Sequence, residues 1–442
     1  MVYRITFINP KVHDGIQYSY KSRMAPYRLA VLAGQVPENW EPKIVDESVE
    51  SLTYEDTDLA AITVSTPTAT RAYEIADGFA EKGVQNLLGG VHPTVRSFEA
   101  SMHGTVVAGE SEVILPKVLK DYEKGILQTY YNGGHVAMNK AKPPRFDLLT
   151  HRYVIYPIQF SRGCPHDCEP CSVSSINGHE HRSKDYQRFI DEINSCGSKF
   201  ILVADDNFIG STKQERENVK TLLRKMKNET DVKLAGQVTV NFAKDRELMK
   251  LAADTGFCEF LIGFEDRDPY SLREIGKAVN CKTEYKKDVI EPMHDNGFSI
   301  TGSFLLGLDN HDKKVFSRYV DFVKDADIDT SVFAIVTPFP STRFEKRLRE
   351  EGRIFRDNYP EDWKYYDINH AVFHPKQMTA GELETGTLEA LSQVTNPLEN
   401  YVRAFKSLIN TRNIYGSGAS FWLNNTTGIR VRNRLREKNH NN

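Results

Sequence analysis

Two long stretches of the chain alternate short apolar runs with amphipathic segments of helical period. In the first stretch, residues 68–83 open on Thr and close on Gly, which predicts a helix. Strands are predicted for the apolar runs at residues 3–8, 43–46, 59–65, 84–88 and 105–109. Alternating strands and helices form parallel sheets that are covered on both faces. We therefore expect a doubly wound α/β domain over residues 1–125.

A second alternation runs over residues 156–340. It predicts helices between six strands, which are expected at residues 154–161, 199–207, 232–238, 257–266, 298–307 and 331–340. Six strand–helix units are enough for a partial (β/α)6 barrel, whose active site lies at the carboxyl ends of the strands. Residues 126–155 carry Gly and Pro pairs and predict a linker. Residues 341–442 predict a mainly helical region, with its clearest helix at 379–394.

Length and composition narrow the class of protein. The chain has 442 residues, so two or three domains are expected, and its 40% apolar and 26% charged residues are typical of a soluble globular protein. The net charge of -3 gives no indication of a nucleic-acid partner. No apolar run is long enough to span a bilayer, and the first residues do not resemble a signal peptide, so we expect a cytoplasmic protein. The basic run from Arg430 to Lys438 is interpreted as a solvated end, with contact to a phosphate-bearing partner as the alternative.

Three cysteines, Cys164, Cys168 and Cys171, lie within eight residues, directly after the first strand of the second alternation. Three thiolates at this spacing can bind a [4Fe-4S] cluster and leave one iron open to a further ligand. A structural zinc ion is an alternative, with a fourth ligand from His166, His179 or His181. A thioredoxin-like pair formed by Cys168 and Cys171 is another. The spacing alone leaves these interpretations open.

The sequence around the cysteines resembles the radical S-adenosylmethionine (SAM) superfamily. The segment "CPHDCEPC" is similar to its three-cysteine motif, and "ADDNF", "GFED", "TGSFLLG" and "TPFP" fall where that family has its strand-end motifs. The first domain, with "FINP" and "GGVHPT", resembles the cobalamin-binding domain of the cobalamin-dependent subgroup. Pro170 departs from the family, which usually has an aromatic residue there. The first domain also lacks the Asp-x-His-x-x-Gly pattern that supplies a cobalt ligand in some cobalamin proteins.

The resemblance implies three cofactors and their contacts. Cys164, Cys168 and Cys171 would bind a [4Fe-4S] cluster whose open iron binds SAM. Further SAM contacts are implied for Arg182, Asp205, Asp206, Asn207, Gln237, Glu265, Gly302, Thr337 and Pro338, with turns, caps, salt bridges and packing as their alternative roles. Cobalamin contacts are implied for Asn9, Pro10, Ser65, Thr66, Gly89, Gly90, Val91, Gly109 and Glu110. His92 is a candidate cobalt ligand by position, and a structural loop histidine is its alternative.

The resemblance also implies an activity. It is the methylation of an unactivated carbon of a small-molecule, lipid or peptide natural product through a 5′-deoxyadenosyl radical. An external electron donor such as flavodoxin or ferredoxin would be the partner. One alternative keeps the cofactors but transfers no methyl group, and instead rearranges a ring or forms a carbon–carbon bond. An alternative of another class is a zinc-stabilised binding module without catalysis.

Overall fold

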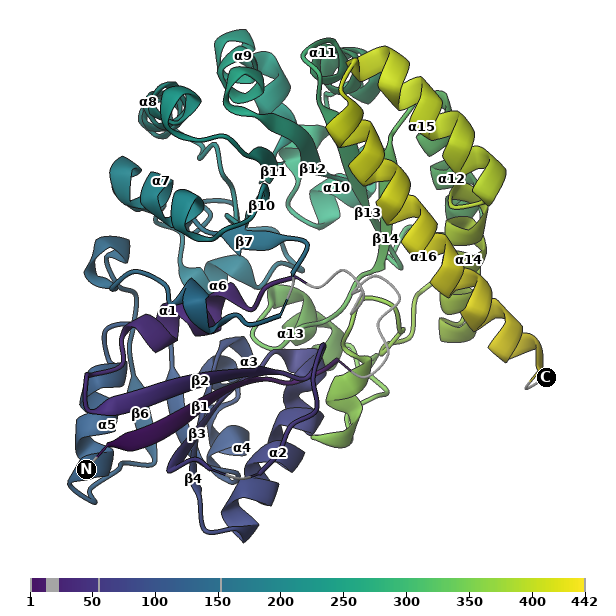
Figure 1. Cartoon of the computed structure of the whole chain (residues 1–442). Coiled ribbons are helices and arrows are strands. Elements are labelled where there is room, and N and C mark those ends of the chain that lie inside the picture. Colours follow the sequence, from purple (N-terminus) through teal and green to yellow (C-terminus); the bar gives the residue numbers. More distant parts are fainter. Residues whose placement is uncertain (1, 13–23, 55, 152, 441–442) are drawn as a thin grey trace.

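The computed structural model describes residues 2–12, 24–54, 56–151 and 153–440. It contains two six-stranded parallel sheets, one above the other in Figure 1, followed by a helical C-terminal region. The predicted α/β architecture with a helical C-terminal region is confirmed. In the described part of the chain, no helix is both long and apolar enough to cross a membrane.

The first sheet has the strand order β2-β1-β3-β4-β5-β6. Its strands are β1 (Tyr3–Asn9), β2 (Trp40–Asp46), β3 (Leu59–Thr63), β4 (Gln85–Gly89), β5 (Thr105–Ala108) and β6 (Tyr130–Asn132). Its helices are α1 (Tyr27–Gly34), α2 (Ala69–Glu81), α3 (Val91–Val95), α4 (Ser97–Ser101) and α5 (Leu115–Glu123). The order reverses between β1 and β3, and ligands of open parallel sheets bind at such a switch point.

Alternate residues of the first sheet serve two separate cores, because successive side chains of a strand point to opposite faces. Ala60 and Ile62 of β3 pack into one core, and Leu59 and Ala61 pack into the other. Strands that are buried on both faces appear in a sequence as continuous apolar runs. This is why β3 was predictable from residues 59–65.

The boundary of the first domain differs from the prediction. Residues 126–155 were expected to be a linker, yet β6 lies within them and pairs in parallel with β5. Three residues flanked by Gly and polar positions give no strand pattern of their own. β6 is formed because the edge of β5 offers unpaired backbone groups.

The second sheet has the order β14-β13-β12-β11-β10-β7, and its two edge strands do not pair with each other, so the barrel is partial. Its strands are β7 (Tyr156–Ile158), β10 (Phe200–Val203), β11 (Lys233–Val238), β12 (Phe257–Glu265), β13 (Ser299–Leu306) and β14 (Thr330–Ile335). Its helices are α7 (Tyr186–Ser195), α8 (Lys213–Glu229), α9 (Arg246–Thr255), α10 (Pro269–Glu274), α11 (Glu291–Asp295) and α12 (Val315–Asp325). Within the described residues, the 3-10 helices are η2 (Thr66–Thr68), η3 (Met138–Lys140), η4 (Phe146–Leu148), η5 (Val240–Lys244), η6 (Ala278–Asn280) and η8 (Glu361–Tyr365).

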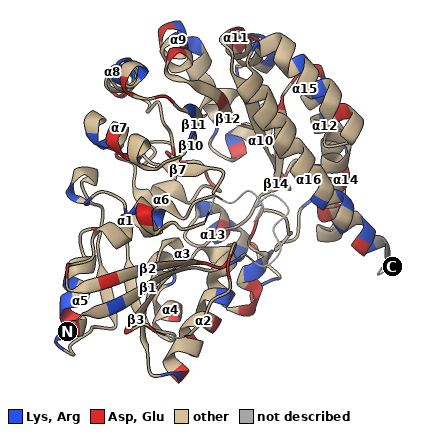
Figure 2. Cartoon of the chain, in the orientation of Figure 1, with Lys and Arg blue, Asp and Glu red and all other residues tan. Residues whose placement is uncertain are grey.

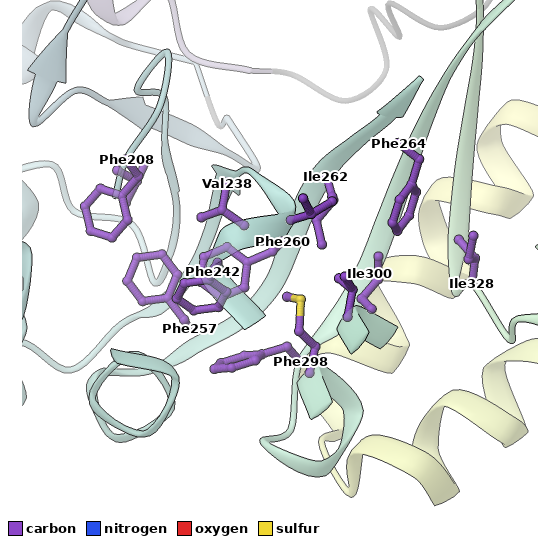
Figure 3. Close-up of a cluster of buried hydrophobic side chains, with 14 of the residues drawn as sticks. Phe208, Val238, Phe242, Phe257, Phe260, Ile262, Phe264, Phe298, Ile300 and Ile328 are labelled. Atoms are coloured by element: carbon purple, nitrogen blue, oxygen red, sulfur yellow. The ribbon is translucent and has the colours of Figure 1, made fainter. Parts of the chain in front are cut away.

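Aromatic side chains fill the space between the second sheet and its helices (Figure 3). The ring of Phe260 lies 4.6 Å from that of Phe242 and 5.0 Å from those of Phe257 and Phe298. A π-helical turn, η7 (Lys286–Ile290), precedes α11, where Pro292 lacks the N–H that would continue a regular helix.

The C-terminal region consists of α13 (Arg343–Glu350), α14 (Ala380–Val394), α15 (Pro397–Thr411) and α16 (Ile414–His440), together with η8. α14 confirms the helix predicted at 379–394, and Thr379 and Glu382 form a capping box at its start. α13 lies between the two sheets in Figure 1. The segment around η8 packs into one core of the first sheet, so the C-terminal region joins both halves of the molecule.

Trp363 is the main anchor of this junction. Its side chain is 1% exposed, its ring stacks on Tyr359 at 3.8 Å, and its Nε1 donates a hydrogen bond to Glu99 at 2.8 Å. Trp363→Ala should lower the free energy of unfolding by about 3–5 kcal/mol, because it leaves a large cavity. Urea denaturation measures this change. Phe98→Ala, at a side chain that is 83% exposed, is the control and should change stability by less than about 0.5 kcal/mol. Equal effects would contradict the anchoring role.

Candidate active site

A short hairpin closes the loop that carries the three cysteines. β8 (Ser161–Arg162) pairs antiparallel with β9 (Arg182–Ser183), and residues 163–181 project between them. Gly163 has a φ of 93°, and a side chain there would overlap the carbonyl oxygen of Glu180. The first cysteine, Cys164, donates its backbone N–H to Gly178 at 3.2 Å. The predicted cysteine loop is therefore a closed, backbone-bonded unit that starts at the mouth of the partial barrel.

Acidic residues at the end of β10 hold this loop. Asp205 is 2% exposed, and its carboxylate accepts hydrogen bonds from the N–H of Phe160 at 2.7 Å and of Ser161 at 2.8 Å. Asp206 accepts from the N–H of Gly163 at 3.0 Å and from Asn177 at 2.8 Å. Both carboxylates thus support the cysteine loop, and their implied contacts to SAM stay a prediction.

Asn207 follows these two acids and is 2% exposed. It donates to the carbonyl of Gly210 at 3.1 Å, and its Oδ1 is buried with no hydrogen-bond partner in the described part of the chain. An unpartnered buried acceptor is costly unless a ligand or water satisfies it. Of the three residues, Asn207 is the one with a buried side-chain oxygen that lacks a partner among the described residues.

The cysteine side chains lie next to a buried lysine. Burial raises the pKa of the thiols of Cys164 and Cys168. Burial also lowers the pKa of Lys277, but the charges of Glu265 and of the sulfurs of Cys168 and Cys171 raise it above its ordinary value. Lys277 donates to Glu265 at 3.1 Å. This cation would counter the negative charge of thiolates at Cys168 and Cys171.

The donor set fits a cluster better than a single ion. Among the described residues, no group of three or more His, Cys, Asp or Glu side chains is arranged to hold one metal ion. A tetrahedral zinc ion requires its ligands to converge on one point. The cysteines of an iron–sulfur cube bind different irons, so their sulfurs need not converge.

Two residues that were implied as contacts to different cofactors bind each other. Glu110, after β5, accepts from Arg182 of β9, with 2.9 Å between Oε2 and Nη1. Arg162 of β8 lies 3.2 Å from the same carboxylate and pairs with Glu112 as well. All four side chains are at most 15% exposed. This buried ion cluster, Glu110, Glu112, Arg162 and Arg182, ties the hairpin of the cysteine loop to the first sheet.

A cavity of about 1070 Å³, including its part open to solvent, lies between the two halves of the molecule. The carboxyl ends of β3, β4 and β5 line it on one side, and Arg162, Ile176 and Asn177 of the cysteine-loop region line it on the other. Among the implied cobalamin contacts, the cavity lining contains Gly89, Gly90, Val91, Gly109 and Glu110. Its deeper wall is apolar, with Phe7, Leu87 and Leu115.

A second cavity of about 810 Å³ lies beside the first and shares Val91 and Ile176 with it. Ser65 and Thr66 line this second cavity, together with Ser172, Phe339 and Pro340. The structure therefore places the loop after β3, the segment after Cys171 and the segment after β14 around one space.

Three other implied cobalamin contacts are engaged elsewhere. Asn9 donates to Asp46 at 2.9 Å, and Pro10 follows it as a buried residue. His92 is fully buried, with Nε2 3.2 Å from Glu99 and Nδ1 3.4 Å from Thr66. Both ring nitrogens have partners, so the position of His92 does not fit a cobalt ligand.

The other residues implied as SAM contacts lie on the strands of the barrel or directly after them. Gln237 of β11 is exposed, and Glu265 has a φ of 64° at the end of β12. A side chain at Gly302 would meet the rings of Phe264 and Phe304 at 3.1 Å, so this glycine serves packing. Thr337 is buried and donates to the carbonyl of Ile335 at 3.0 Å, and Pro338 is buried beside it.

The chain matches no family model. It is 28% identical over 394 residues to bacteriochlorophyllide d C-12(1)-methyltransferase of Chlorobaculum tepidum, which covers 85% of this chain and 84% of that protein. It is 26% identical to hopanoid C-2 methylase of Rhodopseudomonas palustris, over 76% of this chain and 67% of that one. It is 24% identical to anaerobic magnesium-protoporphyrin IX monomethyl ester cyclase of Cereibacter sphaeroides, over 87% of this chain and 69% of that one.

Among solved structures, the chain is similar to TsrM of Kitasatospora setae, a radical SAM methyltransferase with cobalamin and a [4Fe-4S] cluster bound. The TM-score is 0.69 at 14% identity, and the match covers 98% of this chain and 100% of TsrM. The cobalamin-dependent radical SAM enzyme OxsB also gives a TM-score of 0.69, at 15% identity, over 95% of this chain and 72% of OxsB. The chain has the fold of the cobalamin-dependent radical SAM enzymes. The resemblance predicted from the sequence is thereby confirmed.

Several residues around the cysteine loop were missed by sequence reasoning. Lys277 lies twelve positions after Glu265 in no recognisable motif, so only the fold places it beside the cysteines. Arg162 lies two residues before Cys164, and Glu112 lies two residues after Glu110. Their opposite charges at the mouths of two sheets were the available signal.

The ion cluster gives a prediction for stability. Glu110→Gln leaves two buried guanidinium groups short of a charge partner, and breaking a buried pair costs about 3–5 kcal/mol. We expect this loss in the free energy of unfolding at pH 7, measured by urea denaturation. Glu350→Gln, at a carboxylate that is 68% exposed, is the control and should be nearly neutral.

The ion cluster also predicts how the free energy of unfolding depends on pH. Burial opposes ionisation of Glu110, but hydrogen bonds from Arg182 and Val136 and the charge of Arg162 outweigh it and lower its pKa. The stabilisation is therefore complete above the ordinary glutamate pKa of about 4.3 and is lost as the pH falls through the lowered value. The stability difference between wild type and Glu110→Gln should shrink in acid. A difference that grows in acid would contradict the ion pair.

Proposed function

We propose that the protein is a cobalamin-dependent radical SAM enzyme that methylates an unactivated carbon. The observation that carries this proposal is the position of the cysteine loop. It lies at the mouth of the partial barrel, and its hairpin is ion-paired to the Gly-rich edge of the first sheet. A cavity of about 1070 Å³ lies between the two halves at this point. Relatives named as methyltransferases, matched over three quarters of the chain or more, support the same activity.

The residues of this chain fit the cofactors. Cys164, Cys168 and Cys171 would hold the [4Fe-4S] cluster, and Lys277 would balance its charge. Gly89, Gly90, Val91 and Gly109 would border the corrin ring, because they line the cavity at the carboxyl ends of the strands. The bound cofactors supply one-electron cleavage of SAM and a transferable methyl group. The chain itself would bind and orient the cofactors and the substrate, and would exclude water.

The second cavity favours an apolar substrate. Val91, Val95, Ile176, Phe339 and Pro340 line it, and it adjoins the segment that follows Cys171. Ligand sites of this kind are mostly apolar, with a few polar groups that fix orientation. Relatives that act on bacteriochlorophyllide and hopanoid, both largely apolar molecules, agree with this lining. We therefore propose a lipid or another apolar natural product as the substrate.

A second candidate function keeps the cofactors without methyl transfer. The similarity to a magnesium-protoporphyrin monomethyl ester cyclase favours it, because the name of that relative describes ring formation. Both candidates require an external one-electron donor such as flavodoxin or ferredoxin, and a cytoplasmic location would supply it. A zinc-stabilised module is disfavoured by donors that do not converge.

Methyl-labelled SAM separates the candidates. The anaerobically reconstituted protein is incubated with labelled SAM, a reductant and an apolar candidate substrate, and the products are analysed by mass spectrometry. Methyl transfer predicts label in the product together with 5′-deoxyadenosine. Product without label, with 5′-deoxyadenosine formed in step, would contradict methyl transfer and support the second candidate.

Matched cysteine variants control this experiment. Cys168→Ala removes one cluster ligand and should abolish SAM cleavage. Cys281→Ala removes a thiol outside the cysteine loop and should leave cleavage close to that of wild type. Cleavage retained by Cys168→Ala would contradict the assignment of that cysteine to the cluster.

A further inference from the structure

Glu169, the first of the two residues between the second and third cysteines, is held at every polar group. The N–H of Glu169 donates to the carbonyl of Ile275 at 3.0 Å, and its own carbonyl accepts from the N–H of Phe344 at 3.2 Å. Its carboxylate accepts two hydrogen bonds from Arg347, at 2.8 Å from Nε and 3.0 Å from Nη2. Such a bidentate pair fixes direction as well as distance. The tip of the cysteine loop is thereby bound to α13.

Arg347 binds two further carboxylates. Its Nη1 donates to Asp309 at 2.8 Å, and its Nη2 donates to Glu274 at 3.2 Å. Asp309 follows β13, and Glu274 ends α10, the helix after β12. One guanidinium therefore joins the cysteine loop to two strand-end segments of the barrel. A planar fork of five N–H donors can do this, whereas the single ammonium of a lysine cannot.

The side chains around Arg347 are largely shielded from water. The exposed fraction is 26% for Arg347, 13% for Glu169, and 14% for both Glu274 and Asp309. Burial and the negative charge of Asp309 raise the pKa of Glu274, a sign that these acids repel one another. Without the guanidinium, this repulsion would act on the tip of the loop.

The helix that presents Arg347 is itself fixed. Thr342 caps α13 by accepting the N–H of Glu345, while Phe344 and Leu348 are almost fully buried. Figure 2 shows acidic and basic segments around α13, between the two sheets. α13 thus anchors the tip of the cysteine loop from the C-terminal region.

We propose that Arg347 is a positioning residue: by holding Glu169, it sets the placement of Cys168 and Cys171 relative to the ends of β12 and β13. This inference rests on the proposed function only in naming the cysteines as cluster ligands. The clamp itself is a property of the metal-free chain and can be measured there.

The first measurement uses the metal-free full chain under anaerobic conditions. Alkylation of each cysteine by iodoacetamide is followed by peptide mass spectrometry. Arg347→Gln should raise the alkylation rate of the half-buried Cys168 about tenfold, since the loop opens once its bidentate pair is lost. Lys346→Gln removes an equal charge from the same helix, at a side chain that is 76% exposed, and should leave this rate unchanged.

The second measurement tests coupling. Glu169→Gln alone should speed alkylation in the same direction, and Arg347→Gln added to it should have little further effect, because the two residues act through one pair. Arg347→Lys keeps the charge but not the fork, and should fall between wild type and Arg347→Gln. Fully additive effects, or equal rates for Arg347→Gln and Lys346→Gln, would overturn the proposal.

The third measurement links the clamp to the cluster. After reconstitution, the electron paramagnetic resonance spectrum of the reduced cluster should change in Arg347→Gln and be the same as wild type in Lys346→Gln. A wild-type chain that binds no cluster would refute the proposed function while leaving the alkylation result intact. A wild-type chain that binds the cluster, with a spectrum unchanged by Arg347→Gln, would refute the positioning role alone.

Discussion

The buried ion cluster of Glu110, Glu112, Arg162 and Arg182 is the constraint on which the site depends. Apolar contacts between the two halves of the molecule are not directional, whereas a carboxylate bound by a guanidinium fixes distance and angle together. The arginines belong to the hairpin that carries the cysteine loop, and the acids follow a strand of the first sheet. The cysteines and the cavity therefore keep one relative position as long as these charges remain paired.

The cysteine loop is held by every major part of the chain. The first domain holds its hairpin through Glu110, β10 holds its neck through Asp205 and Asp206, and α13 holds its tip through Arg347. No isolated domain contains all of these contacts. Such a composite site is suited to chemistry that needs two cofactors at a fixed separation. Holding reacting groups in a fixed geometry, with water excluded, lowers the barrier to their reaction.

Much of the fold could be predicted from the sequence, because parallel strands that are buried on both faces appear as continuous apolar runs. The cysteine loop was also predictable, since spacing and position after a strand are local features. β6 was missed because three polar-flanked residues become a strand only at the edge of β5. The roles of the site side chains could not be predicted, because they depend on how the two halves of the molecule pack together. Glu110 and Arg182 are 72 residues apart, and each suits a ligand contact until the other is placed beside it. His92 is similar, because Trp363 covers it from a distant segment.

The central claim is that this chain assembles one iron–sulfur cluster opposite one cobalamin. Metal analysis of the anaerobically reconstituted and desalted protein tests it most directly. The account predicts about four irons and about one cobalt per chain, with the brown absorbance of a [4Fe-4S] cluster. A colourless protein that retains zinc, with neither iron nor cobalt, would contradict it.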